Sequence, residues 1–256
     1  MFGGSKSLRR LGLAAFLLCT AAVSAPASAE APKTIILVHG AWADGSSWSK
    51  VVPLLTAKGF HVVAVQLPLT SFADDVATVK RALALETGPV LLSGHSYGGA
   101  VITEAGNDPK VAGLVYVAAF APDAGQSAGS LNASVAPPPM AAEVKPDAEG
   151  FLKLSEKGVA EDFAQDVTPT EKSGLYAAEA PTNVKSLGGQ ISTPAWRSKP
   201  SWYIVAENDR AIQPGLEKTM AQAIHATTIT VPSGHVVMLS KPAEVAAVIE
   251  KAAKGG

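Results

Sequence analysis

The stretch Gly94-His95-Ser96-Tyr97-Gly98 decides the fold that this sequence predicts. It follows an apolar run typical of a buried strand, Pro89-Val90-Leu91-Leu92-Ser93, and leads into a run with helical character. A serine hydroxyl is a poor nucleophile unless a tight turn exposes it beside a base and oxyanion donors. We expect glycine at both flanking positions because only glycine adopts strained dihedrals cheaply and leaves room for the neighbouring strand and helix. The motif therefore predicts that this serine is a nucleophile.

The first 29 residues are typical of a secretory signal peptide. Three basic residues precede an apolar segment, Leu11 to Val23, and Ala27-Ser28-Ala29 has the small-x-small pattern of a cleavage site. The apolar segment has about 13 residues, whereas a membrane-spanning helix needs roughly 20, so we expect no stable membrane anchor. The sequence predicts an exported protein, periplasmic or secreted, whose mature chain begins near Glu30.

Charge and cysteine content exclude several classes of function. The leader contains three of the 21 basic residues and none of the 22 acidic ones, so the mature chain has a formal charge of −4. No basic stripe remains that would indicate a nucleic-acid partner. The single cysteine, Cys19, lies in the leader, which excludes disulfides and thiolate metal sites from the mature chain. Residues 30–256 are sufficient for one domain with a substantial core.

Short β-rich runs alternate with helical patterns along the mature chain. The expected strands are residues 33–39, 61–66, 89–93, 111–119, 201–206 and 227–231. The expected helices are residues 48–59, 71–87, 97–107, 214–226 and 242–253. Such alternation is typical of βαβ units, and strands that are continuously apolar are covered on both faces. The sequence therefore predicts an α/β fold with a mainly parallel sheet flanked by helices.

The expected helix at residues 71–87 has an amphipathic pattern. Ser71 with Asp74 resembles a capping box, and apolar residues follow at helical spacing. We interpret its charged side chains as one solvated face: Asp74, Asp75, Lys80 and Arg81.

Residues 121–196 break the alternation and predict a small cap inserted over the active site. The segment is rich in Pro, Ala, Ser and Gly, and two stretches in it, residues 148–156 and 158–165, have weak helical character. Phe151, Leu152, Val159 and Phe163 are the side chains expected to point inward.

Two groups that a serine nucleophile needs follow later strands. His235, in the loop after the last strand, is the candidate base for Ser96. Asp209, after the strand at residues 201–206, is the candidate acid that holds the second imidazole nitrogen. Glu207 and Asp123 remain alternatives for this acid because each also follows a predicted strand.

The negative oxygen of a tetrahedral intermediate requires backbone donors. The residue after the nucleophile, Tyr97, would provide one amide, and Ala41 in the loop after the first strand would provide the other. Gly40 would allow this loop to approach the serine closely.

Together these motifs carry a resemblance to a known family. They are Ile36-Leu37-Val38-His39-Gly40-Ala41-Trp42 with Trp48, Gly94-His95-Ser96-Tyr97-Gly98-Gly99, Phe120-Ala121-Pro122, Asn208-Asp209-Arg210-Ala211-Ile212 and Gly234-His235. The chain resembles a small bacterial serine esterase of the α/β-hydrolase superfamily, close to the branch of plant methylesterases and hydroxynitrile lyases. The resemblance covers nearly all of residues 33–253 and implies six parallel strands.

The resemblance and the motifs imply hydrolysis of small, uncharged carboxylic esters through an acyl-enzyme, with no metal or cofactor. Hydroxynitrile lyases of that branch have threonine after the first strand's histidine and lysine after the catalytic histidine, where this chain has Gly40 and Val236. A cofactor-free oxygenase or lyase, and a ligand-binding homologue without catalysis, are the alternatives. The oligomeric state does not follow from these features.

Overall fold

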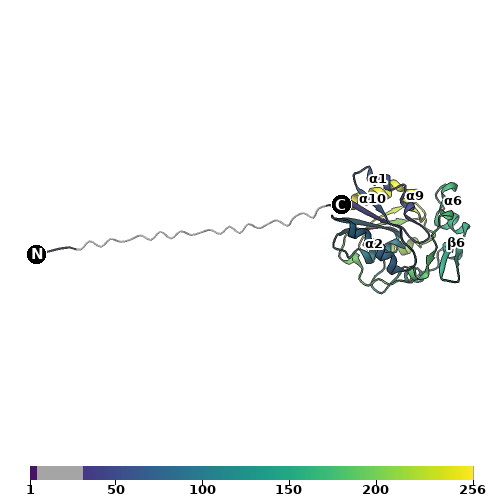
Figure 1. Cartoon of the computed structure of the whole chain (residues 1–256), viewed down its shortest axis with the longest axis horizontal. Helices are drawn as coiled ribbons and strands as arrows, with labels where there is room; N and C mark the ends of the chain where they lie inside the picture. Colours follow the sequence, from purple (N-terminus) through teal and green to yellow (C-terminus); the bar gives the residue numbers. More distant parts are fainter. Residues whose placement is uncertain (5–30, 256) are drawn as a thin grey trace.

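The computed structural model describes residues 1–4 and 31–255, and its centre is a six-stranded parallel sheet (Figure 1). The strand order is β2-β1-β3-β4-β8-β9, and every neighbouring pair is parallel. The strands are β1 (Thr34–Val38), β2 (His61–Ala64), β3 (Val90–Ser96), β4 (Val111–Ala119), β8 (Ser201–Ala206) and β9 (Thr227–Val231). The predicted six-stranded parallel sheet is confirmed.

The core lies around the central strands. All residues of β1, β3 and β8 are buried, as their continuous apolar sequences predict for strands covered on both faces. The edge strand β9 reads Thr-Thr-Ile-Thr-Val, and its first four residues are exposed. The sheet therefore has a dry centre, which gives rigid support to the loops at the carboxyl ends of β1, β3 and β8.

Helices cover both faces of this sheet. They are η1 (Gly45–Trp48), α1 (Val52–Thr56), α2 (Phe72–Leu85), α3 (Gly98–Ala105), α8 (Pro214–Ala223), α9 (Val237–Ser240) and α10 (Pro242–Ala253). Helix α3 packs on β1, β3 and β4 and against α2, whereas α10 packs on β3, β4 and β8 and against α1. Figure 1 shows α1, α9 and α10 on one side of the sheet and α2 on the other. The single helix predicted at residues 48–59 is replaced by η1 and α1.

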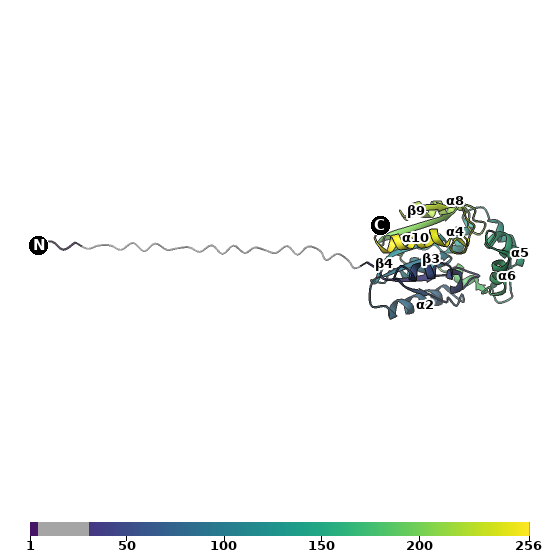
Figure 2. The same cartoon turned by 90° about the horizontal axis from the view of Figure 1, so that it is seen from above.

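The predicted cap is the insertion between β4 and β8. It contains a small antiparallel sheet of β5 (Val144–Pro146), β6 (Phe151–Leu154) and β7 (Thr182–Asn183). Its helices are α4 (Ala128–Ala133), η2 (Pro139–Glu143), α5 (Glu156–Gly158), η3 (Val159–Phe163), α6 (Pro169–Ala177), α7 (Val184–Leu187) and η4 (Ala195–Arg197). Figures 1 and 2 show α5, α6 and β6 at the end of the molecule opposite the carboxyl terminus.

One cap prediction is wrong and the other is confirmed. Residues 148–156 contain the strand β6 and not a helix, because pairing with β5 and β7 satisfies the backbone of this short run. Residues 158–165 contain the helical turn η3, whose Val159 and Phe163 are buried as expected.

The predicted signal peptide falls almost entirely outside the described residues and stays a prediction. Within residues 1–4 and 31–255, no helix is both long enough and apolar enough to cross a membrane.

Candidate active site

All the predicted site residues lie at one edge of the sheet, because the carboxyl ends of parallel strands meet there. Ser96 ends β3, Asp209 follows β8 and His235 follows β9. Ala41 lies in the loop after β1, next to β3 in the sheet. The solvent-exposed fraction is 5% for Ser96, 6% for Asp209 and 1% for His235. The fold thus collects four segments that are far apart in the sequence.

The turn at Ser96 is strained, and the strain is at the serine itself. Ser96 has φ 53°, in the left-handed region that non-glycine residues rarely adopt. Neither Gly94 nor Gly98 has a positive φ, so the expectation that these glycines adopt the strained dihedrals is wrong. They are needed for space: a Cβ at Gly94 would lie 2.6 Å from the Gly98 carbonyl oxygen, and one at Gly98 would lie 2.6 Å from that of His39.

The loop after β1 approaches Ser96 as closely as predicted. A Cβ on Gly40 would lie 2.7 Å from Ser96 Cβ, so only glycine fits. Ala41 and Tyr97 line the same cavity as Ser96. Within the described chain, neither of these two residues donates its backbone amide to another protein group. Both amides are therefore available to a ligand oxygen at the serine.

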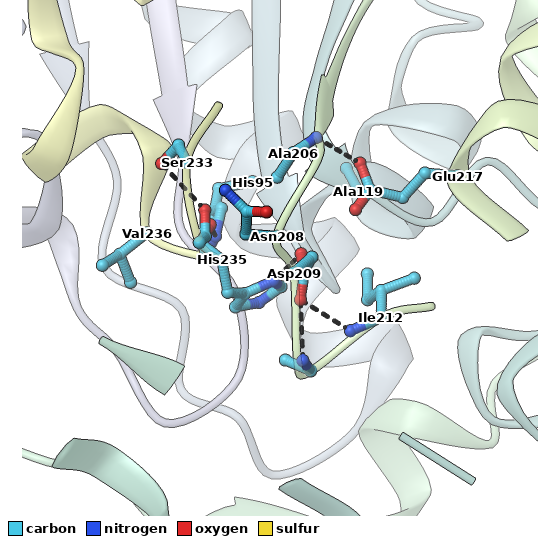
Figure 3. Close-up of polar contacts among 12 residues, drawn as sticks. His95, Ala119, Ala206, Asn208, Asp209, Ile212, Glu217, Ser233, His235 and Val236 are labelled. Carbon is cyan, nitrogen blue, oxygen red and sulfur yellow. Dashed lines mark hydrogen bonds and ion pairs between the residues drawn. The ribbon is translucent and has the colours of Figure 1, made fainter. Parts of the chain in front are cut away.

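His235 and Asp209 form a buried pair (Figure 3). His235 Nδ1 lies 2.6 Å from Asp209 Oδ2, and both side chains are excluded from solvent. The other carboxylate oxygen accepts hydrogen bonds from the amides of Ala211 at 2.7 Å and Ile212 at 2.9 Å. These three hydrogen bonds fix the carboxylate, and the carboxylate in turn fixes the orientation and tautomer of the imidazole.

The two alternative acids lie elsewhere. Glu207 is exposed on the loop after β8. Asp123 forms a surface ion pair with Arg197 at 2.5 Å, and its side chain is 44% exposed. The structure therefore brings Asp209 alone, of the three candidates, to the imidazole of His235.

Ser96 and His235 both lie at this edge of the sheet, at the end of β3 and after β9. Across residues 31–255, no hydrogen bond joins the Ser96 hydroxyl to the His235 imidazole. His95 links them: its ring lies 4.6 Å from that of His235, centroid to centroid, and its Nε2 donates to the His235 carbonyl oxygen at 3.0 Å. Burial holds the pKa of His95 well below its ordinary value. His95 is therefore a neutral structural contact of the His235 loop.

Asp75 does not belong to the solvated face predicted for α2. Its side chain is fully buried, and it accepts hydrogen bonds from the Tyr97 hydroxyl at 2.6 Å and the Leu69 amide at 2.8 Å. Burial raises the pKa of Asp75, and these bonds partly oppose that shift. The sequence spacing could have indicated the burial of Asp75, because this residue lies three residues after Phe72 and four before Val79, on the apolar face of the helix. Asp75 anchors the residue that follows Ser96.

Glu217 is a second buried carboxyl group that the sequence reasoning missed. It lies on α8, is fully buried, and accepts a hydrogen bond from the Ala206 amide at 3.0 Å (Figure 3). Burial, with the nearby charge of Asp209, raises the pKa of Glu217 well above its ordinary value. Protonation of Glu217 removes a negative charge next to Asp209 in this buried site.

A short cap segment, residues 162–166, contacts the loops of both Asp209 and His235; we call it the clamp segment. Asp162 accepts from the Arg210 guanidinium at 2.6 Å, and Gln165 donates to the Asn208 carbonyl oxygen at 2.7 Å. The remaining contacts are Asp166 with the Ser233 hydroxyl at 3.0 Å and the Gly234 amide at 2.7 Å, and Phe163 with His235 at 5.3 Å between ring centroids. Nothing in the irregular cap sequence signals these contacts.

A small cavity of about 60 Å³ opens onto Ser96. Its lining residues are Ala41, Trp42, Ser96, Tyr97, Phe120, Ala128, Gly129, Asn132, Met140, Leu187, Ala211 and Ile212. None of these lining residues, which all lie in the described chain, is an Asp, Glu, Lys, Arg or His. Trp42 ties the loop after β1 to the cap, because its amide donates to Thr182 Oγ1 and its indole to the Leu152 carbonyl oxygen, each at 3.0 Å. The cavity is thus a small, uncharged pocket between sheet edge and cap.

Comparison with known proteins agrees with this architecture. The chain is 28% identical over 250 residues to the α/β hydrolase nvfD of Aspergillus novofumigatus, covering 86% of this chain and 96% of that one. It is 32% identical over 124 residues to a carbendazim hydrolyzing esterase of a Nocardioides species, covering 42% of this chain and 50% of that one. The crystal structure of a pyrethroid hydrolase from Sphingobium faniae superposes with a TM-score of 0.75 at 25% identity, covering 86% and 97% of the two chains.

The family follows from the length of the match. The profile of the α/β hydrolase family matches residues 35–248, from the first strand of the sheet into its last helix. The match includes the Ser96 turn and both loops that carry Asp209 and His235. By sequence and by fold, this chain belongs to the α/β hydrolase family.

Proposed function

We propose that this protein hydrolyses small, uncharged carboxylic esters with Ser96 as nucleophile, His235 as base and Asp209 as the acid that holds His235. The observation that carries the proposal is the buried Asp209–His235 pair at the sheet edge where a strained turn exposes Ser96 to an uncharged pocket. Relatives named as an esterase and a pyrethroid hydrolase support ester cleavage as the reaction.

In the proposed first step, the Ser96 oxygen attacks the ester carbonyl carbon while its proton passes to His235 Nε2. Asp209 accepts the Nδ1 hydrogen and stabilises the imidazolium that forms. The amides of Ala41 and Tyr97 donate to the oxyanion, and each such donor contributes about 10²–10³ in rate. The step requires the Ser96 hydroxyl to turn towards His235, a contact that tightens in many enzymes only when substrate is bound.

In the proposed second half, the alcohol leaves with the proton held by His235, and an ester of Ser96 remains. Water then enters, gives a proton to the same imidazole nitrogen and attacks the acyl carbon. The bond to the Ser96 oxygen breaks, and that oxygen recovers the proton as the carboxylic acid departs. In this proposed cycle the protein ends each turnover unchanged.

The pocket supports small and uncharged substrates. A cavity of about 60 Å³ admits a short acyl or alcohol group. Its side chains include Phe120, Met140, Leu187 and Ile212, which favour apolar surface, and no charged group that would compensate an ionised substrate.

The decisive test is hydrolysis of p-nitrophenyl esters of increasing acyl length by the wild type and by Ser96→Ala. We expect rapid cleavage of short acyl chains, falling as the chain exceeds the pocket, and loss of at least about 10³-fold in kcat for Ser96→Ala. Ser93→Ala is the matched control, because Ser93 is a buried serine of the same strand without a hydrogen-bond partner in the described structure. A folded wild type that is inert on the whole series contradicts the proposal.

We also propose export, on the pattern of the leader. Mass spectrometry of the protein recovered from a host with a general secretory pathway tests this point. We expect a mature chain that begins near Glu30, outside the cytoplasm; an intact chain that retains Met1 in the cytoplasm contradicts it.

A further inference from the structure

Besides Ser96, the cavity contains one polar side chain with a hydrogen-bonding atom that has no partner in the described chain. Trp42 and Tyr97 also line the cavity, but the Trp42 indole donates to the Leu152 carbonyl oxygen and the Tyr97 hydroxyl donates to Asp75. Asn132, at the end of α4, differs from both. Its Oδ1 atom is buried and has no hydrogen-bond partner within the described residues.

This feature separates Asn132 from the other buried polar atoms. Seven further side-chain atoms in the described structure are buried without a partner, and none of them belongs to a residue that lines the Ser96 cavity. A buried acceptor without a donor is unfavourable, whereas the same acceptor becomes favourable when a ligand donates to it. Asn132 therefore combines an unpaired carboxamide oxygen with a place in the lining of the Ser96 cavity.

We propose that Asn132 is a specificity-determining residue that accepts a hydrogen bond from an O–H or N–H group of the substrate. The favoured substrates are small esters whose apolar acyl or alcohol part carries one such donor, for example hydroxy esters. This inference rests on the proposed ester hydrolysis, since it names the substrate class of that same site.

The other side chains that line the cavity leave Asn132 as the acceptor that a donor group of the substrate would reach. Apart from Asn132 and the Ser96 centre, the side chains that face the cavity offer no free acceptor, because they are apolar or already bonded. A substrate that places a methyl ether or a methyl group at Asn132 leaves the acceptor unpaired, whereas a hydroxyl satisfies it. Sites that hydrogen-bond a substrate hydroxyl discriminate strongly against analogues that lack it.

The experiment compares esters that differ only in a donor. The set is methyl butanoate, methyl α-hydroxybutanoate, methyl β-hydroxybutanoate and glycol monobutanoate, with each hydroxy ester paired to its own methyl ether. Values of kcat/KM are measured for the wild type, for Asn132→Leu and for Ser134→Ala. Leucine has nearly the shape of asparagine without its acceptor, and Ser134 is an exposed residue just after α4 that does not line the cavity.

We expect the wild type to favour at least one hydroxy ester over its methyl ether by about tenfold or more, and Asn132→Leu to abolish that preference. The far-UV circular dichroism spectrum and the urea midpoint of Asn132→Leu show whether this variant is folded, and Ser134→Ala should behave as the wild type in every assay. The inference is overturned if no hydroxy ester is preferred, or if the preference survives in Asn132→Leu. Failure of the wild type to cleave any ester, methyl butanoate included, instead overturns the ester hydrolysis on which the inference rests.

Discussion

At the residue scale, the turn around Ser96 places the backbone strain on the serine and the steric requirement on the flanking glycines. The serine adopts φ 53°, and the flanking glycines are selected because a side chain would meet backbone atoms. A serine in the left-handed region costs of order 1–3 kcal/mol, so the surrounding packing must hold it there. The benefit of that strain is that Ser96, although buried, lines the cavity between sheet edge and cap.

The steric requirement at the glycines predicts how a single added methyl group changes the free energy of unfolding. Gly98→Ala would place a Cβ 2.6 Å from the Val38 and His39 carbonyl oxygens. We expect it to lower the free energy of unfolding by about 1–3 kcal/mol, because backbone cannot move aside as a side chain can. Gly174→Ala, in α6 with open space around it, should instead stabilise by about 0.4–1 kcal/mol. Urea unfolding measures the free energy of unfolding of both variants. Equal changes in Gly98→Ala and Gly174→Ala would contradict the packing argument.

Glu217 provides a prediction about pH. Because burial raises the pKa of Glu217, the folded state holds its proton more tightly than the unfolded state, whose ordinary value is 4.5. The associated stability is fully present below pH 4.5 and is lost as the pH rises towards the folded-state pKa. Glu217→Gln retains an acceptor for the Ala206 amide but does not titrate.

We therefore expect Glu217→Gln to gain stability relative to the wild type as the pH rises from about 5 to 8, measured by urea unfolding. Glu207→Gln, at an exposed position of the same loop region, is the control and should show no such trend. A difference between Glu217→Gln and the wild type that does not change with pH would show that Glu217 is ionised in the folded protein.

At the element scale, the clamp segment makes the cap part of the site. Residues 162–166 contact the Asp209 loop and the His235 loop at once, so the cap supports the geometry of the pair as well as covering the pocket. A cap of this kind cannot open as a separate lid without releasing those loops.

Asp166 tests this role, because its carboxylate holds the two residues that precede His235. We expect Asp166→Ala to lower kcat by about tenfold with little change in KM, since a small misplacement of a reacting group is costly. Asp166→Asn keeps an acceptor oxygen and should restore most of the activity. Glu161→Ala, at an exposed neighbour, is the control. Wild-type kcat in Asp166→Ala would show that the clamp segment does not position His235.

At the scale of the whole molecule, the sheet sets a gradient of stability. The central strands β1 and β3 are buried throughout, whereas four residues of the edge strand β9 are exposed. We expect hydrogen exchange of the β9 amides to be faster than that of β3, because edge strands open locally at lower free energy. Exchange monitored by mass spectrometry measures this. Equal protection of both strands would indicate that the sheet opens only by global unfolding.

Much of the architecture was predictable, because its signals are local. Continuous apolar runs identified β1, β3 and β4, and the glycines around Ser96 identified the turn. The order in which Ser96, Asp209 and His235 follow their strands placed them at one edge, since parallel strands end together. Pairing of His235 with Asp209 then agreed with that placement.

The tertiary structure was needed to show which polar groups are buried together. In the sequence, Asp75 and Glu217 are acidic residues within predicted helices. Only their contacts with the Tyr97 hydroxyl and the Ala206 amide show that they are buried. The strand β6 exists because β5 and β7 lie beside it, and Asn132 has meaning only in the cavity that it lines. The sequence by itself determined the alternation of strands and helices, the turn at Ser96 and the chemical type of each candidate residue, since these depend on residues that are near neighbours in the chain. The tertiary structure alone decided burial and pairing, because desolvation and hydrogen bonding depend on residues that are distant in the chain.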